Sequence, residues 1–302
     1  MMLDQNEDPE QLAIIKHKYG FDKPVITQYT SLKTGKYTYT PLITVNKYNL
    51  VIKEPYLRES FQKTGKTVVD VISETLPNTI VLALSAISLA IFLGIFLGIV
   101  SANARDTWLD KIIQVISTLG MSVPSFFSAI LFAWLFGYVL HKFTNLNMTG
   151  SLYEMDDFGE AITIQWKNII LPAIVLGIRP LAVVIQLMRN SLLEVYNQEY
   201  IRTAQAKGLS KWQIVWRHAI KNALNPVVTA VSGWFASMLA GAVFVEYIFG
   251  WNGLGKEIVD ALNTLDLPII MGSVLVIATM FILINILVDL IYGLLDPKVR
   301  IK

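Results

Sequence analysis

The chain of 302 residues has no cysteine and only three histidines. The absence of cysteine excludes disulfides, thiolate metal ligands and a cysteine nucleophile. His17, His141 and His218 stand in different regions, and the sequence contains no HExxH pattern. We therefore expect neither a metal site nor a catalytic site, and no cofactor bound by this chain.

Charge is also scarce, because Asp, Glu, Lys and Arg make up 16% of the residues, against roughly 25% in soluble domains. Hydrophobic residues make up 54%, and the mean hydropathy is +0.51. The formal charge of +2 is too small to indicate a nucleic-acid partner. This composition predicts an all-α membrane protein.

Helix-length apolar runs occur five times along the chain. Because lipid offers no hydrogen-bond partners, a run of about 20 apolar residues has to cross the bilayer as a helix. The predicted spans are residues 79–102, 112–140, 168–188, 223–245 and 267–288.

Two charged residues lie in or at the end of these spans. Arg179, in the third, has three interpretations: structural pairing, a place near a translocation path, or snorkelling in a shifted helix register. Asp289, at the end of the fifth, either bonds a neighbouring helix or lines the path.

The distribution of Lys and Arg predicts the orientation. The loop before the fourth span, with its flanks, holds six cations, whereas residues 141–167 and 246–266 each contain more acids than lysines. The basic loop and the C-terminus are therefore predicted to be cytoplasmic. Five spans then place the N-terminal region outside, although it shows no signal sequence. Either this region crosses the membrane unaided or a further apolar helix precedes Met1, and we expect the second.

The sequence divides into an extracytoplasmic region, residues 1–66, and a transmembrane domain, residues 67–302. In the first, Asp8, Pro9 and Gln11 predict a short helix that ends at Gly20. Residues 37–52 are rich in Tyr, Thr, Val and Ile and predict one or two short strands. Residues 68–76 predict an amphipathic turn before Pro77 starts the first span.

Residues 199–226 form the most informative segment, a basic loop with the pattern of two short helices. Residues 200–207 favour a helix, and Gly208 provides a left-handed stop. Ser210 and Gln213 match a capping box that opens a second helix. We predict that one apolar stripe on this helix consists of Trp212, Val215, Trp216 and Ala219.

An ordered basic loop between membrane spans suits docking to a cytoplasmic partner. Small side chains would let a partner approach closely, and Arg202 and Lys207 could pair with its acids. Three other interpretations are a solvated loop, a pair of helices held at the membrane interface by tryptophans, and a DNA-binding helix-turn-helix.

The basic loop and several other segments resemble the permease subunits of binding-protein-dependent ABC importers, in the dipeptide, oligopeptide and nickel branch. The matching segments are YIRTAQAKGLS from Tyr200, HAIKNALNP from His218, ETLPNT from Glu74, SVPSF from Ser122, LP from Leu171, VEYIFGWNGLG from Val245 and NILVDLIYGLLDPK from Asn285.

The resemblance implies a type I importer permease fold, normally with six membrane helices, in the bacterial inner membrane. It implies two cytoplasmic ATPases that use ATP and Mg²⁺, a second permease subunit and an external solute-binding protein. The cytoplasmic coupling loop would be residues 190–222, and an external gate would face the binding protein. The ATPase-coupling residues are then Tyr200, Arg202, Thr203, Ala204, Gln205, Ala206, Lys207, Gly208, Ser210, His218, Asn222 and Pro226; the gate residues are Glu246, Phe249, Gly250, Gly253 and Gly255.

One segment matches the motif of a phosphate-binding loop only in part, and we do not expect it to bind ATP. Residues 250–256 fit GxxxxGK but are followed by Glu257, where a phosphate-binding loop needs Ser or Thr for Mg²⁺.

Peptides are the favoured solute, and nickel is the alternative within the family. From other classes, an ion-coupled carrier remains open, although we find no internal repeat, as does a membrane scaffold that only docks.

Overall fold

The computed structural model describes residues 13, 43–45, 50–52, 57–155 and 162–295. The chain divides into two compact units, Met1–Thr67 and Val68–Lys302.

The first unit contains a short antiparallel hairpin. Strand β1 (Ile43–Val45) pairs with β2 (Leu50–Ile52), with Ile43 opposite Ile52. Strands are therefore confirmed within residues 37–52. The predicted cap at Asp8 and stop at Gly20 lie outside the described residues; of the helix between them only Ala13 is described, and it is helical.

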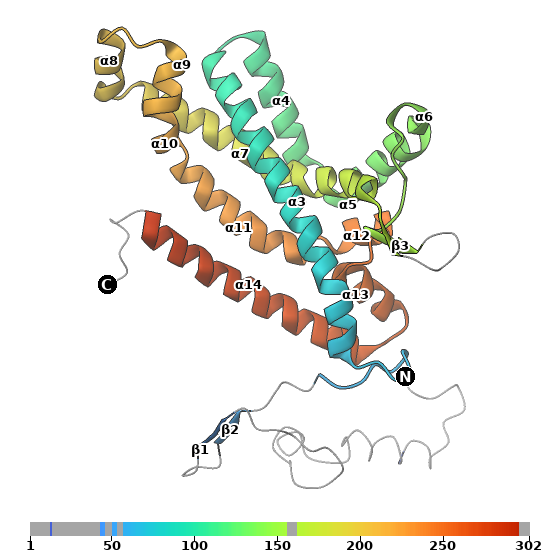
Figure 1. Cartoon of the computed structure of the whole chain (residues 1–302). Helices are drawn as coiled ribbons and strands as arrows, with labels where there is room; N and C mark the ends of the chain where they lie inside the picture. Colours follow the sequence, from blue (N-terminus) through green and yellow to red (C-terminus); the bar gives the residue numbers. More distant parts are fainter. Residues whose placement is uncertain (1–12, 14–42, 46–49, 53–56, 156–161, 296–302) are drawn as a thin grey trace. The chain divides into compact units, whose positions relative to one another are not determined.

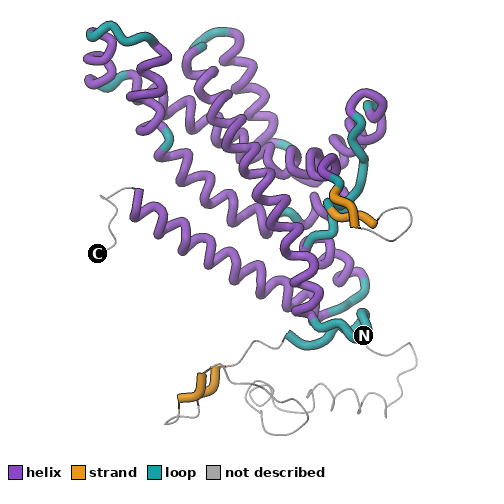
Figure 2. Tube along the Cα trace, in the orientation of Figure 1, coloured by secondary structure: helices purple, strands orange, loops and turns teal. Residues whose placement is uncertain are grey.

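The second unit is helical apart from the two-stranded pair β3 (Tyr153–Met155) and β4 (Ile162–Ile164) (Figure 2). Figure 1 shows α8 and α9 at the end where α3 stops and α4 begins, and α13 near the start of α3. The main helices are α3 (Val68–Asn103), α4 (Trp108–Ser122), α5 (Ser125–Phe132), α6 (His141–Thr144), α7 (Ile170–Tyr196), α11 (Asn225–Gly241), α12 (Val243–Phe249), α13 (Leu254–Asn263) and α14 (Leu267–Leu295).

Three helical stretches are long and apolar enough to cross a membrane by themselves: Val68–Asn103, Trp166–Tyr196 and Leu267–Val288. The other two predicted spans are bent pairs, with 109° between Trp108–Ser122 and Ser125–Val139 and 59° between Asn225–Met238 and Val243–Phe249. The 109° bend falls at Pro124, which follows an extended Val123 and caps α5. Five spans therefore exist in the described chain only if each bent pair counts as one.

The expected start of the first span was wrong. Helix α3 begins at Val68, so the predicted amphipathic turn is its first part and Pro77 lies inside it. Val68 and Val71 are buried, and the hydroxyl of Thr75 donates to the Val71 carbonyl at 2.8 Å. We attribute the continuous helix to this burial, which outweighs the backbone hydrogen bond that proline cannot donate.

Helices α3 and α7 form the centre of the unit through small residues. A Cβ atom at Gly94 would lie 2.6 Å from Val184 Cγ1, and one at Gly98 would lie 2.7 Å from Met188 Cβ. Gly177 of α7 in turn lies against the carbonyl of Ala86. Such contacts let the two backbones approach closely, as is typical of membrane helices.

Candidate functional site

The basic loop folds as the sequence predicts, as two helical segments separated by glycine. Helix α8 (Glu199–Ala206) is followed by Gly208, whose φ of +82° is left-handed. The capping box is present, because the Ser210 backbone N–H donates to Gln213 Oε1 at 2.9 Å and the Gln213 N–H donates to Ser210 Oγ at 3.4 Å. The second segment comprises α9 (Lys211–Ile214), a π-helical turn (Val215–Ala219) and α10 (Ile220–Ala223).

Helix α8 has one buried and one exposed face. Ile201 and Ala204 are buried in the same cluster as Leu192 of α7 and Val215 of the following turn. The exposed coupling candidates on and after α8 are Tyr200, Arg202, Thr203, Gln205, Ala206, Lys207, Gly208 and Ser210. Ala204 was expected to meet a partner, but at 5% exposure it faces inward, because it follows Ile201 by three residues on the same helix face.

The predicted apolar stripe on the second helix is only partly buried. Val215 and Ala219 are buried, whereas Trp212 and Trp216 are 61% and 62% exposed. The π-helical turn over Val215–Ala219 interrupts the 3.6-residue period on which that stripe depends. The loop thus presents two exposed tryptophans in addition to its cations.

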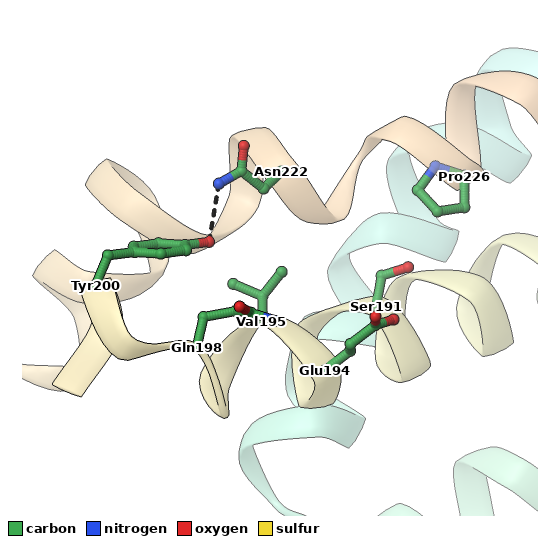
Figure 3. Close-up of a pocket in the computed structure, with 7 residues that line it drawn as sticks. All are labelled: Ser191, Glu194, Val195, Gln198, Tyr200, Asn222 and Pro226. Atoms are coloured by element: carbon green, nitrogen blue, oxygen red, sulfur yellow. Dashed lines mark hydrogen bonds between the residues drawn. The ribbon is translucent and has the colours of Figure 1, made fainter.

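The two ends of the loop are joined at its base. Asn222 Nδ2 donates to the hydroxyl of Tyr200 at 2.8 Å, as Figure 3 shows. Beside this bond is a pocket of about 300 Å³ lined by Ser191, Glu194, Val195, Gln198, Tyr200, Asn222 and Pro226. His218 is half-buried in the π-helical turn, and Pro226 lies in the first turn of α11.

A buried ion pair lies close to the loop. Arg189 Nε donates to Asp110 Oδ1 at 2.8 Å and its Nη2 donates to Oδ2 at 2.7 Å, with side-chain exposures of 18% and 4%. The hydroxyl of Ser101 also donates to this carboxylate, so the network joins α3, α4 and α7. Asp110 was not among the residues predicted from the sequence; the available signal was Thr107 three residues earlier, which caps α4.

The predicted gate segment forms a turn around the buried carboxylate of Glu246. Glu246 is fully buried, and its Oε2 accepts from the N–H groups of Gly255 at 2.7 Å and Lys256 at 3.2 Å. A Cβ at Gly253 would lie 2.5 Å from the carboxyl carbon of Glu246, so glycine is needed there for space. Gly250, with a φ of +66°, ends α12 in the left-handed region. The N–H groups of Gly255 and Lys256, in the GxxxxGK segment, thus donate to the Glu246 side chain of the same chain.

The same turn is bonded to the first span. Trp251 Nε1 donates to the Asn78 carbonyl at 3.0 Å, and Asn78 Nδ2 donates to the Asn252 carbonyl at 2.7 Å. The Leu254 N–H donates to Thr79 Oγ1 at 2.8 Å. Two motifs far apart in sequence therefore form one site.

Most predicted gate residues lie inside this site. Phe249, Gly253 and Gly255 are buried like Glu246, and Gly250 is half-buried, while Asn252 is exposed. Within this chain the buried members shape the turn, and Asn252 is the member of residues 249–255 that is exposed to solvent.

Of the two possible pathway residues, Arg179 is described by the structure, and the side chain of Asp289 is not. Arg179 is exposed on α7, and within the described residues it has neither a hydrogen bond nor an ion pair. Pairing inside the described chain, one of the three interpretations, is therefore not found. The side chain of Asp289 lies outside the described part of the structure.

Comparison with known proteins identifies the family. Residues 90–301 match the family described as binding-protein-dependent transport system inner membrane component, and residues 1–83 match its N-terminal region. The dipeptide transport system permease DppB of Alkalihalophilus pseudofirmus is 33% identical over 316 residues, covering 99% of this chain and 89% of that protein. The di/tripeptide permease DppB of Pseudomonas aeruginosa is 33% identical over 317 residues, covering 99% and 88%.

Solved structures show the same fold. A chain of the MetNI methionine ABC transporter, in inward-facing conformations, has a TM-score of 0.59 at 15% identity over 75% of this chain and 96% of that chain. A chain of an amino acid ABC transporter has a TM-score of 0.55 at 15% identity over 74% and 93%. The predicted type I importer permease fold is thereby confirmed. The chain belongs to the binding-protein-dependent transport system inner membrane components: it is a membrane permease subunit of an ATP-driven importer, in which a separate subunit hydrolyses ATP.

Proposed function

We propose that this chain is one of two permease subunits of a peptide importer and that α8 transmits the closure of two cytoplasmic ATPases to the membrane helices. The names of the similar permeases support peptides as the solute. The observation that carries the coupling role is the division of α8 into a face buried against α7 and an exposed face.

The charges of the chain support one orientation. The exposed cations Arg202 and Lys207, together with those of the following segment, favour a cytoplasmic loop by the positive-inside rule. The C-terminus is then cytoplasmic and the N-terminal region is outside. In this orientation the turn at residues 246–255 faces the compartment of the solute-binding protein.

Motion at α8 has a direct route into the membrane. Ile201 and Ala204 pack in one buried cluster with Leu192 and Val195 of α7. Since α7 is bonded through Arg189 to Asp110 of α4, a displacement of α8 acts on a braced pair of spans. ATP binding closes the ATPases, the loop moves with them, and the spans exchange inward-facing for outward-facing access.

The coupling is reciprocal, because a ligand that favours one global state at one site favours it at the other. Docking of the loaded binding protein at the outer turn should therefore promote ATPase closure.

Single-cysteine labelling tests the docking face, since the chain has no cysteine of its own. Thr203→Cys and Lys207→Cys occupy exposed positions on and after α8, and Asn252→Cys is a control in the turn at the far end. The purified ATPase should protect the first two from a maleimide and leave the control reactive. Equal labelling with and without the ATPase would refute docking at this face. ATP-dependent peptide uptake by proteoliposomes containing the whole complex and its binding protein tests the transport itself.

A further inference from the structure

Arg179 is a charge in the interior of a span, held by no described residue. It lies nine residues after the start of α7, whose bounds are Ile170–Tyr196, and its side chain is exposed. A charged side chain at such a depth faces water, a partner or a cavity, because exposure to hydrocarbon is costly.

The other faces of α7 are covered. Gly94 and Gly98 of α3 pack against Val184 and Met188, which lie about 140° and 180° around the helix from Arg179 at about 100° per residue. Gly120 of α4 packs against Ile178, about 100° away on one side. Neither of these two contacts reaches Arg179 itself, although Val175 and Ala182, about 40° and 60° from it around the axis, are buried by other parts of the chain.

Polar residues continue this face along the helix. Gln186 and Asn190 lie within about 20° of Arg179 around the axis, and they are half-buried and exposed, respectively. A stripe of an arginine and two amides is unsuited to lipid, since each group would lose its hydrogen bonds to water. The stripe therefore favours water or a partner chain over lipid as the neighbour of this face.

Acids elsewhere in the described spans are already engaged. Asp110 is bonded to Arg189, and the Glu246 carboxylate accepts from the turn at Gly255. Glu194 is on the same helix but 15 residues further on, about 22 Å along the axis. A counter-charge for Arg179 is therefore not provided by the described residues and has to come from outside them.

We propose that Arg179 binds the free terminal carboxylate of the peptide during its passage through the membrane. The planar guanidinium presents paired N–H donors that match both oxygens of a carboxylate. The proposal rests on the proposed function as a peptide importer and adds a selectivity step in the permease itself. Gln186 and Asn190 provide amides further along the same face.

The test compares two peptides that differ only at the C-terminus, one a free acid and one an amide, chosen because the binding protein binds both. Uptake is measured in proteoliposomes containing the whole complex and normalised to the loaded fraction of binding protein. Arg179→Gln should lower uptake of the acid by about 10-fold or more and leave uptake of the amide unchanged. Arg179→Lys should retain part of the uptake of the free-acid peptide, because lysine keeps the positive charge. The uptake should stay below that of the wild type, because lysine lacks the paired N–H donors of the guanidinium.

Arg105→Gln is the matched control, since Arg105 is exposed and pairs with its neighbour Asp106; both peptides should enter this variant as in the wild type. If Arg179→Gln lowers the uptake of both peptides equally, or of neither, this inference is overturned and the proposed function is not. Loss of the second permease from purified Arg179→Gln complexes would also overturn it, by showing that Arg179 pairs with an acid of that subunit. If the wild type imports neither peptide, the proposed function fails and the inference fails with it.

Discussion

Asp110 and Arg189 are 79 residues apart in sequence and form a bidentate ion pair with hydrogen bonds of 2.8 and 2.7 Å. Both side chains are largely shielded from solvent. Removing one partner of such a pair leaves an uncompensated buried charge, which typically costs about 3–5 kcal/mol. Asp110→Asn should therefore destabilise the detergent-solubilised protein, as a lower thermal midpoint in a tryptophan fluorescence or scanning calorimetry experiment would show.

A double-mutant cycle isolates the pair. Asp110→Asn combined with Arg189→Gln should cost less than the sum of the two single changes, because neither charge is then left alone. Additive losses would show that the two residues stabilise the protein independently.

Gly208 tests whether the backbone turn after α8 is needed for transport. Gly208→Pro cannot adopt the φ of +82° and should abolish uptake while membrane insertion continues. Gly208→Asn should retain most uptake, because asparagine tolerates the left-handed region and a Cβ at this position meets nothing within 4 Å. Normal uptake by the proline variant would contradict the coupling role of the turn.

Ala204 and Ala206 separate folding of the loop from docking. Ala204 is buried on the inner face of α8, and Ala206 is exposed on the same helix. Ala204→Trp should loosen the loop through overpacking, at a cost of about 1–3 kcal/mol, and increase its cleavage by proteases. Ala206→Trp should leave protease resistance unchanged and reduce co-purification of the ATPase. The same behaviour from both variants would rule out this division of faces.

Gly253 reports on the turn around Glu246. Gly253→Ala places a Cβ 2.5 Å from the carboxyl carbon of Glu246 and should lower thermal stability. Adding Glu246→Ala removes the obstructing carboxylate, so the double variant should lose less than the sum of the single losses. A purely additive result would mean that this close approach does not determine the effect of Gly253→Ala.

A hydrogen bond from Trp251 to the first span can be removed by a single substitution. Trp251→Phe deletes the donor to the Asn78 carbonyl and should cost about 1–3 kcal/mol, because the removed donor and the smaller ring act together in a buried site. Thermal unfolding measures this directly. Tyr247→Phe, at an exposed position of α12, is the control and should change stability little.

The sequence was sufficient for features with local causes. Apolar runs located the spans, and Ser210 with Gln213 predicted a cap that the structure contains. Features set by tertiary packing were missed. These features are the 109° bend after Ser122, the inward position of Ala204 and the exposure of Trp212. They depend on neighbouring helices and on a π-helical turn that no residue pattern predicted.

The site was predictable to a similar degree. The motifs around Asn78 and Gly253 were both noted, but their meeting could not be derived because 174 residues separate Asn78 from Asn252, its hydrogen-bond partner. Asp110 was overlooked for the same reason, since an acid at the start of a helix is unremarkable until Arg189 is placed beside it.

The hydrogen bond between Tyr200 and Asn222 has a mechanical consequence. It fastens the start of the basic loop to its end, just where the chain leaves the third span and approaches the fourth. If α8 receives the proposed displacement from an ATPase, this bond helps to carry the displacement to α7 and α11 together instead of stretching the loop. The third and fourth spans are then expected to change position in a single step.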